Sequence, residues 1–405
     1  MDTNKDIRKG YNFNRIAIGI IRILFGWLIC LVMNFRCKHY KPKDKTFMVL
    51  GNHTMNLDPV FDVILLRHFV RFVASSNIMR GFPGCFVKWF ANPIPRKKGA
   101  PADDVIENVK ASLAAGIPVA MYPEGNVTWD GETGFISRRT AELVKESEGS
   151  LITLRKIGGC LKFPRWAMVK RRGPIYGEVV NEYSREELNN MTVDEILEVI
   201  RKDLYVDAYK EQETRHWKYR CSALAKGLEA SLYVCPVCGK VGELSSDKDR
   251  FFCECTASWT YDVEGYLHPE KNGEDEAKIP VHTFSDEEKI SVLEWSRWQK
   301  AYLRDNAEGL KACVDEPICV DDGIMVYGDR LEIPNAIIQN GPKEEGKERS
   351  VYYWSDIQKL SLFRDTRLFF TWKDQVVEVH VNPHVENIGI RYYALWRICT
   401  GREYV

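Results

Sequence analysis

Strand-like and helix-like segments alternate along the first half of this sequence, and that alternation restricts the possible folds more than any other feature. The apolar runs typical of buried strands are "TFMVLGNHT", "FVASSN", "IPVAMYPEGNVT", "SLITLRKIGG" and "GPIYGEVVNEY". Between them, "DPVFDVILLRHFV", "ADDVIENVKASLAAG" and "SRRTAELVKESE" have apolar residues at helical spacing, and "TVDEILEVIRKDLYVDAYKEQ" predicts one long amphipathic helix. This order predicts an α/β domain over residues 41–225, with a mixed sheet flanked by helices.

The character of the sequence changes after this domain. Residues 226–270 contain short strand-like segments and cysteines, residues 271–306 read as a linker with a helix over 285–305, and residues 307–405 are mostly strand-like up to a closing helix that ends at Gly401. We therefore expect a C-terminal, mostly-β domain closed by a helix. The order of its elements resembles that of a pleckstrin-homology domain.

Four cysteines between residues 235 and 255 have the pattern C-x2-C-x14-C-x-C, which is formed by Cys235, Cys238, Cys253 and Cys255. Two such pairs of thiolates can close a tetrahedral site, so the segment predicts a zinc ribbon with structural zinc. The alternative is four unrelated buried thiols. A closed four-sulfur site has no open coordination position, and we assign no catalysis to it.

Residues 16–33, "IAIGIIRILFGWLICLVM", are apolar apart from Arg22, and basic residues flank them on both sides. Such a segment suits a helix over residues 1–40 that lies in one leaflet of a bilayer, or a single anchor, with both ends at the cytoplasmic face. The alternative is a buried core helix. The formal net charge of +0 indicates no general field for nucleic acid, so we expect no nucleic-acid partner. Twelve cysteines without a disulfide pattern indicate a reducing compartment such as the cytoplasm.

The segment "LGNHTMNLDPVF" places His53 and Asp58 at a passage from strand to helix. An aspartate that reaches back to one ring nitrogen fixes the tautomer of a histidine, and the other nitrogen can then take a proton from a hydroxyl. The alternative is that Asp58 only begins a helix. Two further segments contain polar residues that could contact a substrate. The loop "NPIPRKKGA" offers Arg96 and Lys97 as phosphate contacts, and "YPEGN" offers Glu124 and Gly125 after a strand.

In this order, "NHTMNLDP", "NPIPRKKGA", "YPEGN" and "SLITLRKIGG" resemble the motifs of the glycerolipid acyltransferase family, the family of bacterial lysophosphatidic acid acyltransferases. The resemblance implies that His53 is a general base oriented by Asp58, that Arg96 and Lys97 bind the phosphate of the acceptor, and that Glu124 and Gly125 help to hold its glycerol. It implies transfer of a fatty acyl group from acyl-CoA or acyl-ACP to a lysophospholipid, with 1-acyl-glycerol-3-phosphate as the first choice. The partners would then be the bilayer, the lysophospholipid and the acyl donor.

The sequence departs from this family where an arginine is expected after the Glu-Gly pair, because Asn126 and Val127 stand there. Arg138, Arg139 or Arg155 could replace the missing arginine. Other interpretations are the same chemistry on another acceptor, such as glycerol 3-phosphate, or a non-catalytic membrane adaptor that binds lipid and a partner protein.

Overall fold

The structure is a computed structural model that describes residues 3–79, 88–89, 91–96, 103–270, 280–286, 288–321, 323–363, 367–381 and 389–402. The chain divides into two compact units. The first contains residues Met1–Lys162 and Arg172–Trp217, and the second contains Phe163–Arg171 and Lys218–Val405. The short segment 163–171 therefore leaves the first unit and belongs to the second.

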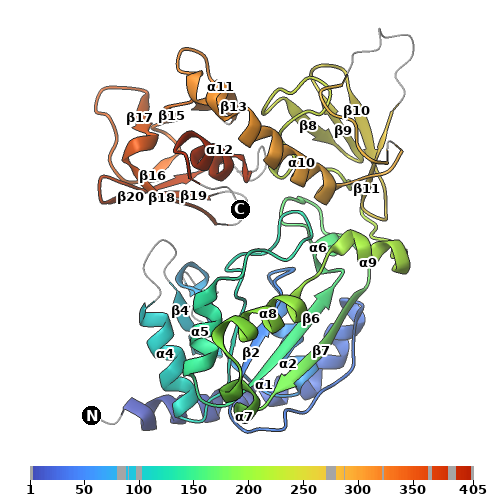
Figure 1. Cartoon of the computed structure of the whole chain (residues 1–405), viewed down its shortest axis with the longest axis vertical. Coiled ribbons are helices and arrows are strands. Elements are labelled where there is room, and N and C mark those ends of the chain that lie inside the picture. The colour runs from blue at the N-terminus through green and yellow to red at the C-terminus, as the bar shows by residue number, and fades with distance from the viewer. Residues whose placement is uncertain are drawn as a thin grey trace. The chain divides into compact units, whose positions relative to one another are not determined.

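The first unit is built on one mixed sheet, in the order β1-β7-β6-β2-β5-β3-β4 among the described residues (Figure 1). Its strands are β1 (Phe35–Cys37), β2 (Phe47–Gly51), β3 (Arg71–Ser75), β4 (Ile94–Arg96), β5 (Val119–Met121), β6 (Ser150–Ile157) and β7 (Ile175–Tyr183). Strands β2 to β6 run parallel to one another, whereas β7 pairs antiparallel with β6. This agrees with the predicted α/β domain and its mixed sheet.

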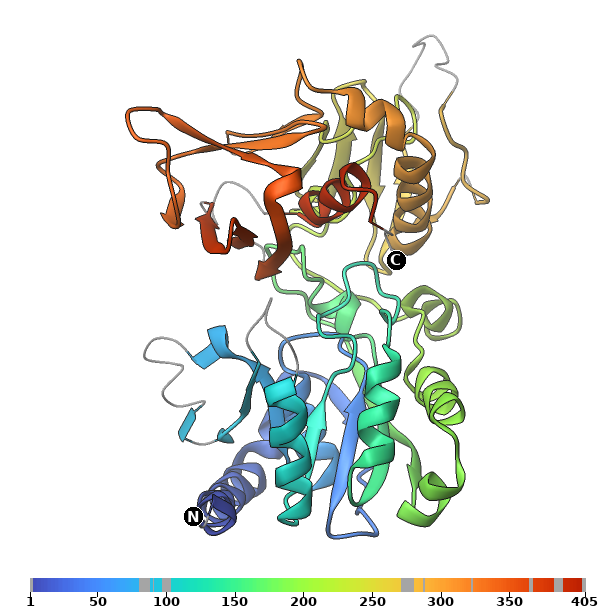
Figure 2. The ribbon, with the colours of Figure 1, turned by 60° about the vertical axis from the view of Figure 1, so that its left-hand side comes forward.

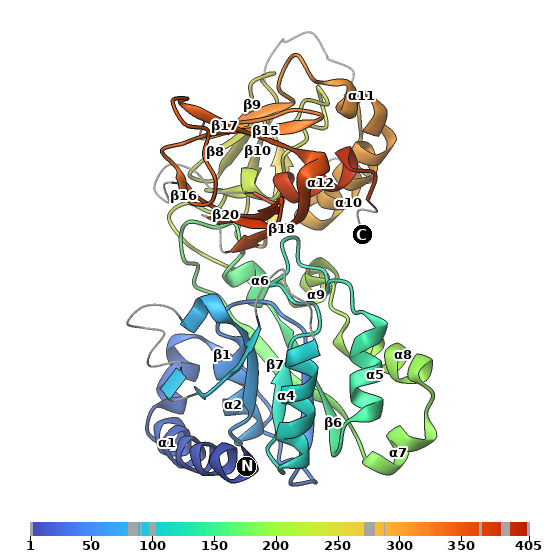
Figure 3. The same ribbon diagram turned by 90° about the vertical axis from the view of Figure 1, so that its left-hand side faces the viewer.

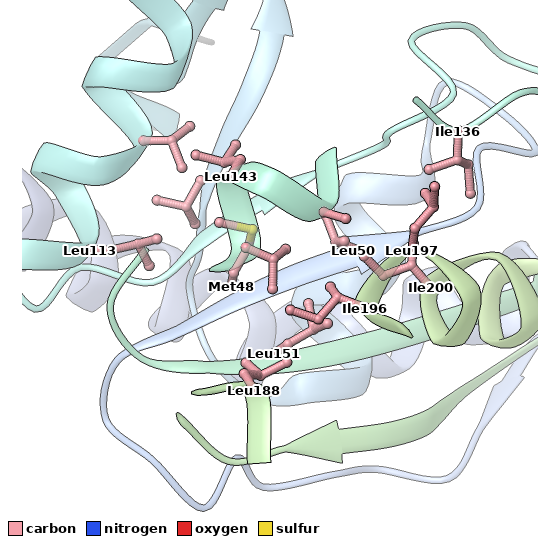
Figure 4. Packing of buried hydrophobic residues seen from close by; sticks show 14 of the residues in the cluster. Met48, Leu50, Leu113, Ile136, Leu143, Leu151, Leu188, Ile196, Leu197 and Ile200 are labelled. Atoms are coloured by element: carbon pink, nitrogen blue, oxygen red, sulfur yellow. The ribbon is translucent and has the colours of Figure 1, made fainter. Parts of the chain in front are cut away.

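Helices cover both faces of this sheet (Figure 3). They are α1 (Thr3–Val32), α2 (Asp58–Leu66), α4 (Asp103–Ala114), α5 (Arg138–Glu146), α6 (Gly159–Lys162), α7 (Arg185–Asn190), α8 (Val193–Leu204) and α9 (Ala208–Arg215). Met48 and Leu50 of β2 point into a core shared with α4, α5 and α8, part of which is shown in Figure 4. Phe47 and Val49 alternate with them and pack toward α2 on the other face. Because both faces are covered, β2 is apolar throughout.

One helix prediction is wrong in detail. The stretch 192–212 was expected to be a single helix, but it forms α8 and α9 with a break between them. At the break, the amide of Val206 donates to the Thr133 hydroxyl, and the Thr133 amide donates to the carbonyl of Val206. The Asp207 side chain then accepts from the amides of Tyr209 and Lys210 and begins α9. These tertiary contacts outweigh the helical periodicity.

The second unit begins with the cysteine-bearing segment, whose described strands pair in the order β12-β11-β10-β9-β8. They are β8 (Leu244–Asp247), β9 (Arg250–Cys253), β10 (Ser258–Tyr261), β11 (Tyr266–Pro269) and β12 (Ile290–Ser291). Helix α10 (Val292–Asp305) follows, and it starts later than the predicted residue 285 because residues 290–291 pair with β11 instead.

The remainder of this unit is rich in strands, as expected. In the described residues, one sheet has the order β13-β14-β15-β17 and another the order β16-β20-β19-β18. The strands are β13 (Cys319–Asp321), β14 (Ile324–Val326), β15 (Arg330–Pro334), β16 (Ile338–Asn340), β17 (Arg349–Tyr353), β18 (Ile357–Phe363), β19 (Arg367–Trp372) and β20 (Gln375–His380). The unit also contains α11 (Ala307–Ala312), and α12 (Arg391–Cys399) follows the last strand.

Helix α1 differs from the other helices in its exposure. Within the described part of the chain, it is the one helix that is long and apolar enough to cross a membrane, over Gly10–Val32, by length and composition only. Figure 2 shows it (dark blue) at the periphery of the first unit. Only 6% of its most apolar window is buried, and Ile23, Trp27 and Leu31 are among its exposed side chains. The alternative of a buried core helix therefore fails, because such a helix would have its apolar residues covered.

Candidate functional site

Several polar groups, among them His53, Arg96 and Glu124 that the sequence singled out, lie along one edge of the sheet. Strands β2, β4, β5 and β6 are parallel, and His53, Arg96, Glu124 and Lys156 lie at or just beyond their carboxyl ends. Ligands of open α/β sheets bind outside this edge. Strand β4 lies three positions from β2 in the sheet order, so the backbone of Arg96 is about 14 Å across the sheet from the strand that leads to His53.

His53 and Asp58 form the dyad that their spacing predicted. The Nδ1 atom of His53 lies 2.8 Å from Oδ2 of Asp58, and Asp58 begins α2. The same carboxylate accepts from the amides of Thr54 and Met55, at 2.7 and 3.0 Å, and from the Thr54 hydroxyl. Asp58 therefore fixes the loop that precedes the helix and orients the imidazole. Because Nδ1 faces the carboxylate, Nε2 is the ring nitrogen left for a substrate.

The charge on Asp58 is maintained by its surroundings. This side chain is fully buried, and burial alone would raise its pKa. The positive charge of Lys156 and the hydrogen bonds from His53 and from the Met55 amide outweigh burial, so that the pKa of Asp58 lies below its ordinary value. Asp58 therefore presents a negative charge to the His53 ring.

Glu124 and Gly125 follow β5 and lie next to the dyad. One carboxylate oxygen of Glu124 accepts from the amide of His53 at 2.7 Å, and the other accepts from the amide of Gly134 at 2.6 Å. Burial raises the pKa of Glu124 to about 7, although these two amides oppose the shift. Gly125 has a φ of +72°, a conformation that favours glycine. The Glu124 carboxylate thus ties the His53 loop to the loop before α5.

A further set of buried residues was not recognised in the sequence. Lys156 of β6 donates to Asp62 of α2 at 2.7 Å, and Tyr122 donates to the other carboxylate oxygen of Asp62 at 2.6 Å. The Tyr122 ring stacks on the His53 ring, with 4.3 Å between centroids and 13° between planes. The signal was a lysine inside a strand expected to be buried, because a buried ammonium needs an acidic partner.

A small cavity opens beside the dyad. This cavity is partly open to solvent, and it is lined by His53, Thr54, Glu124, Thr128, Thr133 and Lys156, together with other residues. The backbone around it is well fixed, because the side-chain amide of Asn52 exchanges two hydrogen bonds with the backbone of Lys156, at 2.9 and 2.7 Å. A polar cavity with a base at its wall can orient a hydroxyl for proton removal.

The predicted phosphate contacts are only partly placed. Arg96 ends β4 at the same edge of the sheet, whereas Lys97 lies outside the described residues. The three arginines that could replace the missing one all have carboxylate neighbours. Arg138 pairs with Asp194 and Glu142, Arg139 lies 3.9 Å from Asp103, and Arg155 pairs with Glu178 at 2.7 Å.

The four cysteines of the second unit meet in space. The Sγ atoms of Cys235, Cys238, Cys253 and Cys255 all lie within 4.8 Å of one another, and two of the pairs are 3.8 Å apart. For four sulfurs each about 2.3 Å from a central zinc, the expected S–S separation is about 3.8 Å. Each cysteine pair also has a tight turn, with a positive φ at Gly239 and at Thr256. The geometry fits a tetrahedral four-thiolate metal site.

Comparisons with known proteins also indicate an acyltransferase in the first unit. Residues 32–158 match the model of the family described as Acyltransferase. This segment is less than half of the chain, and it includes His53, Asp58, Arg96 and Glu124. The match supports an acyltransferase, as the dyad geometry does.

Among solved structures, the chain is similar to the 1-acyl-sn-glycerophosphate (LPA) acyltransferase PlsC from Thermotoga maritima. The sequence identity is 17%, the TM-score is 0.38, and the alignment covers 52% of this chain and 80% of that one. No curated protein sequence matches the chain.

Proposed function

We propose that this chain is a membrane-associated acyltransferase that moves a fatty acyl group from an acyl thioester to the hydroxyl of a lysophospholipid. The first choice of acceptor is 1-acyl-glycerol-3-phosphate, with phosphatidic acid as the product and acyl-CoA or acyl-ACP as the donor. The observation that carries the proposal is the 2.8 Å contact between Nδ1 of His53 and the buried Asp58, beside a polar cavity.

The reaction follows from this geometry. Nε2 of His53 takes the proton of the acceptor hydroxyl while its oxygen attacks the thioester carbonyl, and Asp58 stabilises the imidazolium that forms. The tetrahedral intermediate then collapses with cleavage of the C–S bond. The imidazolium returns the proton to the leaving sulfur, so the products are an ester and a free thiol. His53 ends as it began, and no acyl-enzyme is needed.

We assign Arg96 and Lys97 to the acceptor phosphate, because Arg96 ends a strand at the same sheet edge and further basic residues follow it in the sequence. Glu124 and Gly125 shape the glycerol side of the cavity. The contacts of Glu124 with two backbone amides favour a role in fixing the loops rather than in binding glycerol through both of its oxygens.

The decisive experiment is acyl transfer from acyl-CoA and acyl-ACP to a panel of acceptors. The panel contains 1-acyl-glycerol-3-phosphate, glycerol 3-phosphate, lysophosphatidylcholine and a monoacylglycerol without phosphate. We expect turnover on a phosphate-bearing acceptor and its loss in His53→Ala. Arg96→Ala should raise KM for acceptors with an exposed phosphate and leave KM for monoacylglycerol unchanged. Full activity of His53→Ala on every acceptor would show that the dyad is not the base.

The panel also tests the adaptor interpretation. Its support is the absence of an arginine after Gly125 and the engagement of both Glu124 oxygens by backbone amides. An adaptor would show no turnover on any acceptor with either donor, and a stoichiometric partner would copurify with it. The retention of a hydrogen-bonded His53–Asp58 pair favours the enzyme instead.

We assign α1 to the bilayer, at its cytoplasmic face, as a monotopic helix or a single anchor. The support is the exposed apolar surface of this helix and the basic residues on both sides of it. Replacing Ile23, Trp27 and Leu31 together by glutamate should abolish sedimentation with vesicles. The matched control replaces three valines of the second unit, Val281, Val320 and Val376, which are also exposed. Equal binding of both triple variants would place the membrane contact elsewhere.

We also propose that the four cysteines bind one structural zinc per chain, because their Sγ separations suit a tetrahedral site. Cys235 and Cys253 are buried, so the metal would fix the two turns from inside the fold. Domain boundaries at residues 40, 225, 270 and 306, and a pleckstrin-homology type for the last domain, remain predictions from the sequence.

A further inference from the structure

Lys156 and Asp62 form a buried ion pair directly beneath the dyad. Their side chains are 0% and 1% exposed, and the ammonium lies 2.7 Å from the carboxylate. A buried pair of this kind is commonly no more stabilising than well-packed apolar residues would be, because both charges lose their hydration. The stability of the fold therefore does not explain why this pair is present.

The pair is joined to the dyad on two sides. Tyr122 donates to Asp62 at 2.6 Å, the length expected of a hydroxyl that donates to an ionised carboxylate, and its ring lies flat against His53. On the other side, the charge of Lys156 is the strongest influence that lowers the pKa of Asp58. Lys156 also lies 4.9 Å from the centroid of the Tyr122 ring. Tyr122 thus contacts the face of the imidazole, Lys156 lowers the pKa of Asp58, and Asp62 binds both Tyr122 and Lys156.

The charges around His53 bear on proton transfer. Burial raises the pKa of Asp62, whereas the charge of Lys156 and the hydrogen bond from Tyr122 oppose that shift. With Asp58 and Asp62 ionised, the two carboxylates and the ammonium of Lys156 sum to one negative charge, and ionised Glu124 adds to it. A negative surrounding stabilises the imidazolium that forms when the acceptor hydroxyl is deprotonated, and Lys156 and Asp62 set how negative that surrounding is.

We propose that Lys156, Asp62 and Tyr122 are positioning residues that set the charge around His53 and fix the plane of its ring. The proposal rests on the proposed role of His53 as the base. Without Lys156, the surrounding charge becomes more negative, so His53 keeps its proton up to a higher pH. Without Asp62, the ammonium of Lys156 is unbalanced, and His53 gives up its proton at a lower pH.

Among the described residues, the other titratable groups near His53 are Asp58 from α2, Tyr122 and Glu124 from the turn after β5, and Cys160 from α6. None of them is changed in these variants. Because the comparison changes only Lys156 or Asp62, the shared groups cancel in the difference between two proteins.

The test measures the pH at which His53 is half protonated, by NMR of the labelled imidazole in the full-length protein. Assignment comes from the signal that is lost in His53→Gln. We expect Lys156→Met to move the midpoint up by about one pH unit or more, and Asp62→Asn to move it down by a similar amount. The double variant removes both charges and should return the midpoint close to the wild-type value. A purely structural role would instead give shifts in the same direction and a double variant at least as perturbed as either single one.

Matched controls come from buried charges that do not contact the dyad. Lys162→Met removes a buried lysine that donates to the carbonyl of Met33. Asp203→Asn removes a buried carboxylate that accepts from Thr153, Asn181 and Tyr183. Neither control should move the His53 midpoint. If Lys156→Met does not fold, Asp62→Asn decides alone, and an unchanged midpoint in it overturns the proposal.

A kinetic arm separates this proposal from the proposed function. In an active enzyme, the acidic limb of kcat/KM should follow the His53 midpoint in each variant, up for Lys156→Met and down for Asp62→Asn. Absence of acyl transfer by the wild-type protein would reject the proposed function but leave the NMR comparison valid. Opposite shifts in the two single variants would then still establish the network, and parallel or absent shifts would refute it.

Discussion

Replacement of Asp58 by asparagine is the sharpest test of the dyad. Oδ2 of Asp58 accepts from Nδ1 of His53 and from the amides of Thr54 and Met55, and Oδ1 accepts from the Thr54 hydroxyl. An asparagine oxygen in the place of Oδ2 keeps the three nitrogen donors, and the hydroxyl of Thr54 can rotate to accept from the new amide. The loop and the start of α2 should therefore survive while the negative charge disappears.

The magnitude follows from that lost charge. The imidazolium and the carboxylate are in hydrogen-bond contact, with their charge centres roughly 4 Å apart, and at an effective dielectric constant of about 20 their attraction is about 4 kcal/mol. This attraction exists only when His53 is protonated, so its loss raises the barrier of the chemical step. We expect kcat of Asp58→Asn to fall about 1,000-fold. KM should change little, because Asp58 is fully buried and cannot touch the acceptor.

The assay is steady-state release of the thiol from acyl-CoA at saturating acceptor, with thermal unfolding and circular dichroism measured on the same samples. Asp203→Asn is the matched control, because it also neutralises a buried carboxylate and lies outside the dyad. A loss of less than tenfold in Asp58→Asn, with the fold intact, would refute the electrostatic role of Asp58. An equal loss in Asp203→Asn would show that the effect is not specific to the dyad.

Three further outcomes follow from the structure. The pKa of Glu124, about 7 against an ordinary 4.5, means that the folded chain binds this proton more tightly than the unfolded chain. Its contribution to the free energy of unfolding is therefore greatest below pH 4.5 and falls by up to about 3 kcal/mol as the pH rises to about 7. Thermal melts of Glu124→Gln should lack this decline, and a wild-type-like decline in the variant would contradict the assignment. A Cβ atom at residue 159 would lie 2.1 Å from Oγ1 of Thr54, so Gly159→Ala should cost about 1–3 kcal/mol by urea unfolding and reduce activity. Gly309→Ala, where no atom lies within 4 Å, is the control, and equal effects would contradict the argument. Elemental analysis should find one zinc per chain in the protein and none in Cys235→Ser. Unchanged zinc content in the variant would show that Cys235 is not a ligand.

Local patterns in the sequence were enough to predict the dyad. His53 and Asp58 are close along the chain, and a strand followed by a helix allows the carboxylate to reach back to the ring. The alternation of apolar runs likewise predicted the α/β sheet. In both cases the interaction depends on residues within one strand–helix unit, where periodicity and capping rules apply.

The Lys156–Asp62 pair could not be predicted in the same way. The two residues are separated by 94 positions, and they meet because β6 lies beside β2, whose following helix carries Asp62. The sequence indicates that a lysine in a buried strand needs an acidic partner. Which acidic residue that is depends on the order of the strands in the sheet. The break between α8 and α9 has a similar origin, because Thr133, remote in the sequence, takes the backbone groups of Val206.

The excursion of residues 163–171 into the second unit has a consequence for synthesis of the protein. Trp166 and Arg171 pack against Tyr261, at centroid distances of 5.7 and 5.0 Å, although both precede β7 of the first unit. On a ribosome that adds about 5–20 residues per second, Tyr261 appears several seconds after Arg171. During that interval β7 can complete the sheet of the first unit, whereas Trp166 cannot yet make its contact with Tyr261. A nascent chain that stalls before residue 261 would therefore present this indole to chaperones.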